Sequence, residues 1–304
     1  MRQILADQAL DPDFQSRGYV KLPMLSADEV VRMLHGVRQL RPDDHFAGNL
    51  ATYHCSFLDT NIDYKRQTFE LIQSVFAPHI DRLLSGFRLL NANFYVKPPG
   101  TGEFTIHQNW PALDLDDTSV TIWCPLGEVT PSNGAIQVVA GSHKILPHVE
   151  APNSPAYFDG FTDLLVRDYL RPIPMQAGEA LIFDDSLIHW SARNDSDSPR
   201  IAIQAMCVPT DATPVLYFKA DDGRFELIDA DSEFYLTYGP ADLGARRPEW
   251  RSLGFVEDRN RPVSGREFAK LMKRAEAARA AAALPEGGPE QRPATRRFGR
   301  YLHR

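Results

Sequence analysis

Short apolar segments rich in β-forming residues follow one another through the middle of this chain, and they restrict the fold more than any other feature. They span residues 88–96, 119–126, 135–140, 179–184 and 200–208, and Gly, Pro, Asn or Asp residues separate them. No helical pattern alternates regularly with these segments. A doubly wound parallel sheet needs such helices, whereas antiparallel strands joined by turns pack as a sandwich or jelly roll. The pattern therefore predicts a mainly β fold of the second kind.

Helical patterns flank this region. A short strand is expected over 14–23, and Ser26 with Glu29 forms a capping box that opens the first long helix. Apolar residues recur at helical spacing over 64–84, where Pro78 predicts a break into two helices. We expect these helices to pack on the outside of the sheet.

The chain divides by composition near residue 262. Residues 1–262 are predicted to form one domain, and 263–304 a C-terminal helix with a basic tail. Ser264 and Glu267 make a second capping box before an Ala-, Lys- and Arg-rich helix that should run to about Leu284. The Pro-interrupted basic residues after it are typical of a solvated tail.

Charge and cysteine content restrict the possible partners and compartment. The net charge is −7 with a pI near 5.7, which argues against nucleic acid as a partner. No apolar run reaches the ~20 residues that cross a bilayer, and the first residues lack a signal-peptide pattern, so no membrane association is expected. Cys55, Cys124 and Cys207 are odd in number and widely spaced, as expected for buried thiols in the cytoplasm.

Two histidines stand where apolar strand segments end. His107 lies in the segment FTIHQNW, and His189 follows the segment LIFDDSLI. A single histidine at such a position is more often a satisfied core or turn residue than a ligand, so only the pair in its context predicts chemistry. Asp184 and Asp185 are adjacent on a strand and should face opposite sides, which makes them poor partners for acid–base work.

The remaining histidines give weaker signals. His143 lies in a Gly-Ser-His turn and is expected to be structural, and His54, His79 and His148 lack a partner at a metal-binding spacing. No Gly-rich phosphate loop, nucleophile elbow or Cys–His pair is present in the sequence.

Several motifs in the same order resemble the phytanoyl-CoA dioxygenase family. They are RGYVKLPMLSADEV, FYVKPPGTG, IHQNW, TIWCPLGEVTPSNGAIQVVAGSHK and AGEALIFDDSLIHWSARNDSDSPRIAI, and together they cover roughly residues 14 to 210. The resemblance implies a double-stranded β-helix, which is a cupin-like jelly roll. It also implies iron(II) as cofactor, 2-oxoglutarate as cosubstrate, oxygen, and a small-molecule substrate.

The resemblance assigns roles to individual residues. In the family, His-x-Asp and a distant His hold iron on one face, and side chains at i and i+2 of an extended segment reach one metal from the same side. His107 and His189 match the two histidines. Arg200, eleven residues after His189, matches the arginine that grips the distal carboxylate of 2-oxoglutarate. Ser191 and Trp123 match residues that line the same pocket, and Lys97 is a weaker candidate for it.

Asparagine stands at the family's aspartate position, so the third metal ligand is open between three alternatives. In the first, which is slightly favoured, Asn109 coordinates the metal weakly while the 2-oxoglutarate dianion supplies much of the affinity. In the second, Asp114 replaces Asn109 as ligand, which needs the chain to fold back after Trp110 and Pro111. In the third, water or halide fills the ligand position, or no iron binds.

The predicted function is hydroxylation of a small organic substrate, with 2-oxoglutarate converted to succinate and carbon dioxide. A halogenase or other oxidative enzyme that uses the non-carboxylate position is one alternative, and a catalytically silent jelly roll that binds a small molecule is another. Residues 150–172, with Asp114, Asp116 and Asp117, are the expected substrate-side features. The sequence does not identify the substrate.

Overall fold

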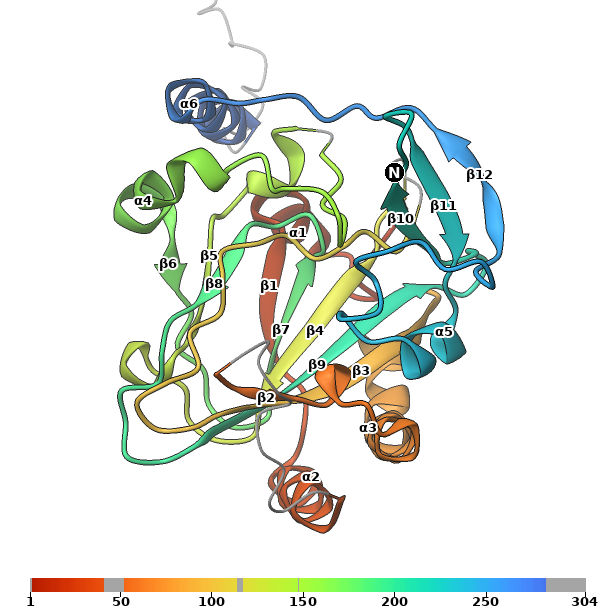
Figure 1. Ribbon diagram of the computed structural model, residues 1–304. Helices are drawn as coiled ribbons and strands as arrows, with labels where there is room; N and C mark the ends of the chain where they lie inside the picture. Colours follow the sequence, from red (N-terminus) through yellow and green to blue (C-terminus); the bar gives the residue numbers. More distant parts are fainter. Residues whose placement is uncertain (1, 41–51, 114–116, 147, 283–304) are drawn as a thin grey trace, which may run out of the picture.

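The computed structural model describes residues 2–40, 52–113, 117–146 and 148–282, and β-strands dominate its centre (Figure 1). The strands are β1 (Tyr19–Pro23), β2 (His54–Cys55), β3 (Phe87–Lys97), β4 (Val120–Pro125), β5 (Ile136–Val138), β6 (Arg171–Pro172), β7 (Glu179–Asp184), β8 (His189–Ser191), β9 (Arg200–Pro209), β10 (Val215–Lys219), β11 (Phe225–Asp229) and β12 (Ser252–Val256). The helices are α1 (Asp11–Arg17), α2 (Ala27–Leu40), α3 (Ile62–Leu83), α4 (Thr162–Leu164), α5 (Ser232–Thr237) and α6 (Gly265–Ala282). Short 3-10 or π turns are η2 (Ser56–Leu58), η3 (Pro131–Asn133), η4 (Ser142–Lys144), η5 (Asp159–Phe161) and η6 (Leu165–Tyr169).

Two antiparallel sheets form the jelly roll. The larger has six strands in the order β1-β7-β4-β9-β3-β2, and the smaller has three in the order β6-β5-β8. Strand neighbours in the large sheet are distant in the chain, as in β4 between β7 and β9. The mainly β, jelly-roll prediction is confirmed.

The two faces of the large sheet carry two different cores because side chains alternate along each strand. The outer face packs against α2 and α3 in a core that includes Met33, Ile72, Phe76, Ile122, Ile182 and Ile203. The inner face packs against the small sheet in a core that includes Trp123, Ile136, Val138, Leu181 and Phe183. The helices lie outside the sheet, as expected, and the space between the sheets is left for a ligand site.

The prediction that Pro78 splits the second helical region is wrong. Helix α3 continues from Ile62 to Leu83 with Pro78 inside it. Proline removes one backbone hydrogen bond. Residues on both sides of it, among them Phe76 and Ile80, are buried against the sheet, and this packing holds the helix together.

A third sheet lies beyond the jelly roll and was not predicted. Strands β10, β11 and β12 pair in that order, and β11 is irregular between Leu227 and Ile228. Together with α5 they enclose a separate core around Leu216, Ile228 and Trp250.

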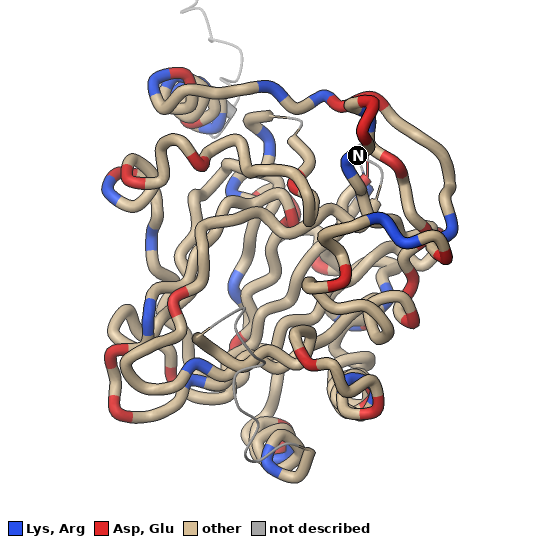
Figure 2. Tube along the Cα trace, viewed as in Figure 1, with Lys and Arg blue, Asp and Glu red and all other residues tan. Residues whose placement is uncertain are grey.

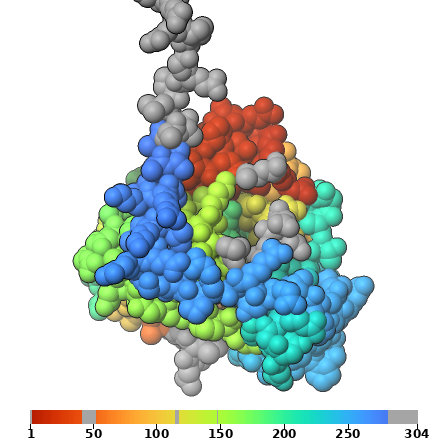
Figure 3. Space-filling view, turned by 90° about the horizontal axis from the view of Figure 1, so that it is seen from above, coloured from red at the N-terminus to blue at the C-terminus, as the bar shows by residue number. Residues whose placement is uncertain are grey.

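Helix α6 packs on the jelly roll. Its residues Phe268 and Met272 are buried with Phe161 and Leu165 in one cluster, and Figure 3 shows α6, in blue, lying across the green segment of the chain. The backbone N–H of Glu267 donates to the Ser264 hydroxyl at 3.2 Å, which confirms half of the predicted capping box. The division at residue 262 stays a prediction, and the basic tail after 282 lies outside the described residues.

Charged residues of both signs are interspersed along the chain (Figure 2).

Ser26 and Glu29 form the predicted capping box, with the Glu29 carboxylate accepting from the backbone N–H of Ser26 at 2.8 Å. Within residues 2–282, gaps excepted, no helix is long and apolar enough to span a bilayer.

Candidate active site

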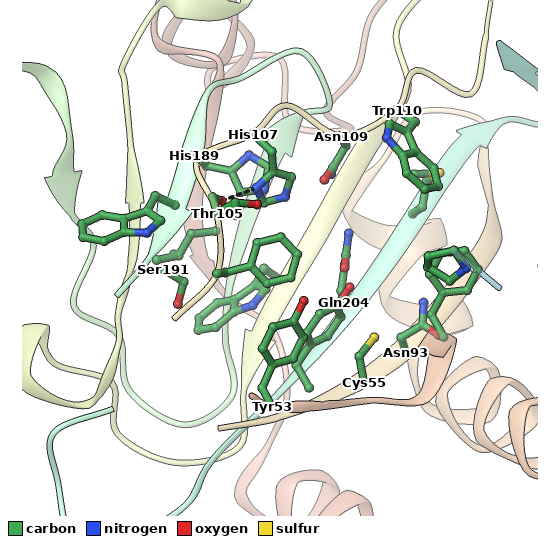
Figure 4. A pocket seen from close by; sticks show the side chains of 18 of the residues that line it. Tyr53, Cys55, Asn93, Thr105, His107, Asn109, Trp110, His189, Ser191 and Gln204 are labelled. Atoms are coloured by element: carbon green, nitrogen blue, oxygen red, sulfur yellow. Dashed lines mark hydrogen bonds between the residues drawn. The ribbon is translucent and has the colours of Figure 1, made fainter. Parts of the chain in front are cut away.

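A pocket of about 410 Å³ lies between the two sheets of the jelly roll, within the usual size range of small-molecule sites. Its floor is the inner face of β3, β4 and β9, and β8 and the segment around residues 104–110 form one side. Figure 4 shows the polar side chains from these elements converging on one space.

His107 and His189 meet in this pocket. Each backbone N–H donates to the other residue's carbonyl oxygen, at 3.0 and 2.9 Å, and the ring centroids are 4.0 Å apart. The Nδ1 atom of His107 lies 2.8 Å from the Thr105 carbonyl oxygen, and that of His189 lies 2.9 Å from the Leu187 carbonyl oxygen. These acceptors place a proton on Nδ1 and leave the Nε2 lone pair of each ring available.

Both imidazoles are held in the neutral form that binds metals. Burial lowers the pKa of His107 to about 4, and burial followed by the proximity of His107 lowers the pKa of His189 well below its usual value. A metal ligand must be deprotonated at the binding atom, so these two rings meet that requirement at neutral pH.

Asn109 lines the same pocket beside His107. Its amide nitrogen donates to the Thr121 hydroxyl at 2.8 Å and to a carboxylate oxygen of Asp185 at 2.9 Å. The oxygen end of the side chain points into the pocket (Figure 4). In the described part of the chain, no three His, Cys, Asp or Glu side chains cluster closely enough to hold a metal. Asp114, the alternative ligand, lies outside the described residues, as does Asp116.

Arg200 contributes a buried and largely unsatisfied guanidinium. Its Nε and Nη1 atoms have no hydrogen-bond partner among the described residues, and Nη2 is 3.4 Å from the Ser191 hydroxyl. The guanidinium carbon lies 5.2 Å from the centroid of the Trp123 ring. Burial lowers the pKa of Arg200 to about 9. A buried guanidinium whose N–H groups lack acceptors is energetically unfavourable, and a bound carboxylate would supply those acceptors.

Lys97 lies beside Arg200, where β3 pairs with β9. Its ammonium donates to the Ser191 hydroxyl at 2.7 Å and to the Ala192 carbonyl oxygen at 2.5 Å. Burial and the neighbouring Arg200 lower the pKa of Lys97 to about 6. Arg200, with Lys97 beside it, therefore makes this end of the pocket the one suited to an anion.

The pocket thus has an anion-binding end at Arg200 and Lys97. Apart from that end, it contains the neutral imidazoles of His107 and His189 beside the amide oxygen of Asn109. The model of the family described as phytanoyl-CoA dioxygenase matches residues 14–202, which is more than half of the chain. This chain belongs to the phytanoyl-CoA dioxygenase family. The family comprises non-haem oxygenases that depend on iron(II), 2-oxoglutarate and oxygen.

Two relatives and one solved structure are similar to this member of the phytanoyl-CoA dioxygenase family. A methylphosphonate hydroxylase of Gimesia maris is 26% identical over 214 residues, which cover 66% of this chain and 79% of that protein. Phytanoyl-CoA dioxygenase 1 of Oryza sativa subsp. japonica is 28% identical over 154 residues, covering 45% of this chain and about half, 52%, of that protein. The crystal structure of the non-haem α-ketoglutarate-dependent carbocyclase SnoK from nogalamycin biosynthesis shares the fold, with a TM-score of 0.53 at 20% identity over 66% of this chain and 83% of SnoK.

Several pocket residues of this family member were missed by the sequence reasoning. Asn93 and Gln204 lie opposite each other on β3 and β9 and form a neutral polar part of the floor. They lie four residues along each strand from Lys97 and Arg200, roughly 13 Å at the strand rise. The signal was available, because positions 93 and 97 have the same parity and therefore share a strand face.

The expected substrate-side features are only partly at the pocket. Among the described residues of 150–172, Glu150 alone lines it, and its carboxylate accepts from the backbone N–H of Gln108 at 2.9 Å. Residues 157–170 instead pack against α6. Asp117 forms an ion pair with Arg2 at 3.2 Å, so it does not line the pocket.

Four further histidines lie outside the lining of this pocket. His54 contacts Tyr64 and His79 contacts Glu29, each at 2.9 Å, while His143 and His148 are buried outside the pocket lining. The three cysteines are free and buried.

Proposed function

We propose that this chain hydroxylates a small organic substrate in the pocket between the two sheets, with iron(II) held by His107, Asn109 and His189. The observation that carries the proposal is the meeting of two imidazoles, each with an available Nε2 atom, in one pocket with an unsatisfied buried guanidinium. Iron(II) bound with 2-oxoglutarate and oxygen supplies the oxidising power, and 2-oxoglutarate leaves as succinate and carbon dioxide.

The residues of this chain prepare the site for the metal and the cosubstrate. Thr105 and Leu187 fix the tautomers of His107 and His189 through their carbonyl oxygens, so that each ring keeps a neutral Nε2 atom available. Arg200 is proposed to bind the distal carboxylate of 2-oxoglutarate in a bidentate manner.

Ser191 and Lys97 support that anion from the side of β8. The Ser191 hydroxyl donates to the Gly134 carbonyl oxygen at 2.8 Å and accepts from Lys97, which orients its oxygen beside Arg200. Trp123 covers one face of the guanidinium and keeps water from it. A dianion placed here would balance the charge of Arg200 and favour the protonated form of Lys97.

The walls around the histidines are aromatic and restrict water. Phe104 lies 4.5 Å from the ring of His107 in a tilted arrangement, and Phe183 lies 4.9 Å from the ring of His189, measured between centroids. A dry pocket protects a reactive intermediate from side reactions. The substrate is proposed to lie over the neutral part of the floor, beside Asn93 and Gln204.

Anaerobic titration with iron(II) and 2-oxoglutarate tests this assignment. The parent protein is expected to show the visible charge-transfer band of the chelated metal, and His189→Ala to show none. Product analysis with and without chloride then separates hydroxylation from halogenation. A parent protein that retains no iron and develops no band would contradict the proposal.

A further inference from the structure

Asn109 and Asp185 are joined at two points, although they are far apart in the sequence. The backbone N–H of Asn109 donates to the Asp185 carbonyl oxygen at 2.8 Å, in addition to the bond between the amide nitrogen and the carboxylate. Thr121, on the neighbouring strand β4, donates its hydroxyl to the same carboxylate oxygen at 2.6 Å. All three side chains are buried, so water does not compete strongly for these bonds.

This network dictates which end of the Asn109 amide faces the pocket. The Thr121 hydroxyl has a single proton, which it gives to Asp185, so it can only accept from Asn109. The carboxylate oxygen of Asp185 also accepts from the amide. Both neighbours therefore require the amide nitrogen, and the amide oxygen must point the other way, into the pocket (Figure 4).

We infer that Asp185 is a positioning residue that turns the Asn109 oxygen toward the metal site and supplies, one hydrogen bond away, the negative charge that the ligand itself lacks. This inference rests on the proposed function. An amide that donates to a carboxylate is polarised, and its oxygen becomes more negative and a better metal ligand. The charge that a ligating aspartate would carry at position 109 is thus carried at position 185.

The hydrogen-bond network predicts that the asparagine and the aspartate can be exchanged between positions 109 and 185. Asn109→Asp alone would place two buried carboxylates in contact, with only the Thr121 hydroxyl between them. Asn109→Asp combined with Asp185→Asn would rebuild the same hydrogen bond in the opposite direction, with the amide at 185 donating to a carboxylate at 109. The double variant should therefore recover what the single variant loses.

Urea unfolding of the metal-free proteins tests the pair without any reaction. We expect a lower unfolding midpoint for Asn109→Asp than for the parent, and recovery of at least half of that loss in the double variant. Asp184→Asn is the matched control, because Asp184 is the neighbouring acid and accepts from Ser186 rather than Asn109. A double variant no more stable than Asn109→Asp would overturn the inference.

Calorimetric titration with nickel(II), in the presence of 2-oxoglutarate and without oxygen, tests the role toward the metal. Asp185→Asn should weaken nickel binding about tenfold, as loss of a residue that orients a ligand typically does. The double variant should bind nickel at least as tightly as the parent, and Asp184→Asn should match the parent. Equal affinity of Asp185→Asn and Asp184→Asn would overturn the inference. Absence of nickel binding by the parent would instead contradict the proposed function.

Discussion

Lys97 and Arg200 lie directly opposite each other on β3 and β9, and both are buried in one pocket. The Lys97 ammonium donates to neutral oxygens of Ser191 and Ala192, and within the described residues no carboxylate forms an ion pair with either cation. Burial, and after it the neighbouring charge of Arg200, lower the pKa of Lys97 and disfavour its charged form. A bound dicarboxylate counters this effect.

Replacing Arg200 with Ala should weaken 2-oxoglutarate binding by about 2 kcal/mol or more, which is about 30-fold in Kd. The reason is the loss of the bidentate partner and of the cation that Trp123 covers. Anaerobic calorimetry with nickel(II) and 2-oxoglutarate measures the change. Arg200→Lys keeps the charge and should recover only part of the affinity. Unchanged affinity in Arg200→Ala would show that another residue anchors the cosubstrate.

Binding of 2-oxoglutarate should take up a proton at pH 7 to 9. Lys97 has a pKa of about 6 without the anion and is therefore mostly neutral, while a neighbouring carboxylate favours the charged form. Calorimetry in buffers of different ionisation enthalpy measures the uptake, and Lys97→Met should abolish it. Proton uptake that persists in Lys97→Met would assign it to another group.

The same residue should make the ligand-free protein more stable as pH rises. The folded pKa of Lys97 is about 6 and the unfolded value is near 10, so the unfolded state binds the extra proton between these values. Its unfavourable contribution is complete below about pH 6 and disappears toward pH 10. The difference in unfolding free energy between the parent and Lys97→Met, followed over this range in urea, should therefore shift in favour of the parent.

Glu150 should have the opposite dependence. Burial raises its pKa to about 8, while its unfolded value is near 4.5, so ionisation costs folding free energy progressively between these values. Glu150→Gln keeps an oxygen acceptor for Gln108 and should increase stability relative to the parent at pH 9 but not at pH 4. Urea unfolding at both pH values measures this. The exposed Glu70→Gln is the control, and an equal effect of both substitutions would contradict the assignment.

Helix α6 should be stabilised mainly by Phe268. Its side chain is fully buried against Phe161 and Tyr169, so Phe268→Ala should cost about 3–5 kcal/mol of unfolding free energy. Lys270→Ala, on the exposed side of the same helix, should change it by less than about 0.5 kcal/mol. Chemical denaturation compares the two. Similar small effects would mean that α6 unfolds separately from the jelly roll.

Local patterns predicted most strands of the jelly roll and the histidine pair, because hydrophobic runs and turn residues are encoded within a few positions. The sequence did not reveal that Pro78 lies inside one helix, since packing on the sheet outweighs one lost hydrogen bond. Contacts between distant residues were also missed. The contact of Asp185 with Asn109, for example, depends on how the segment after His107 crosses the end of β7.

The polarity of the pocket floor changes along β3 and β9, from the basic pair Lys97 and Arg200 to the neutral pair Asn93 and Gln204. The two ends of the pocket therefore favour different ligands. A dicarboxylate can place only one of its two carboxylates at Lys97 and Arg200. Its other carboxylate then extends toward the imidazoles of His107 and His189. A neutral molecule gains no electrostatic binding energy at Lys97 and Arg200, so it is expected to bind beside the amides of Asn93 and Gln204. Two reactants of different charge can thus bind in the same pocket, each at its own end.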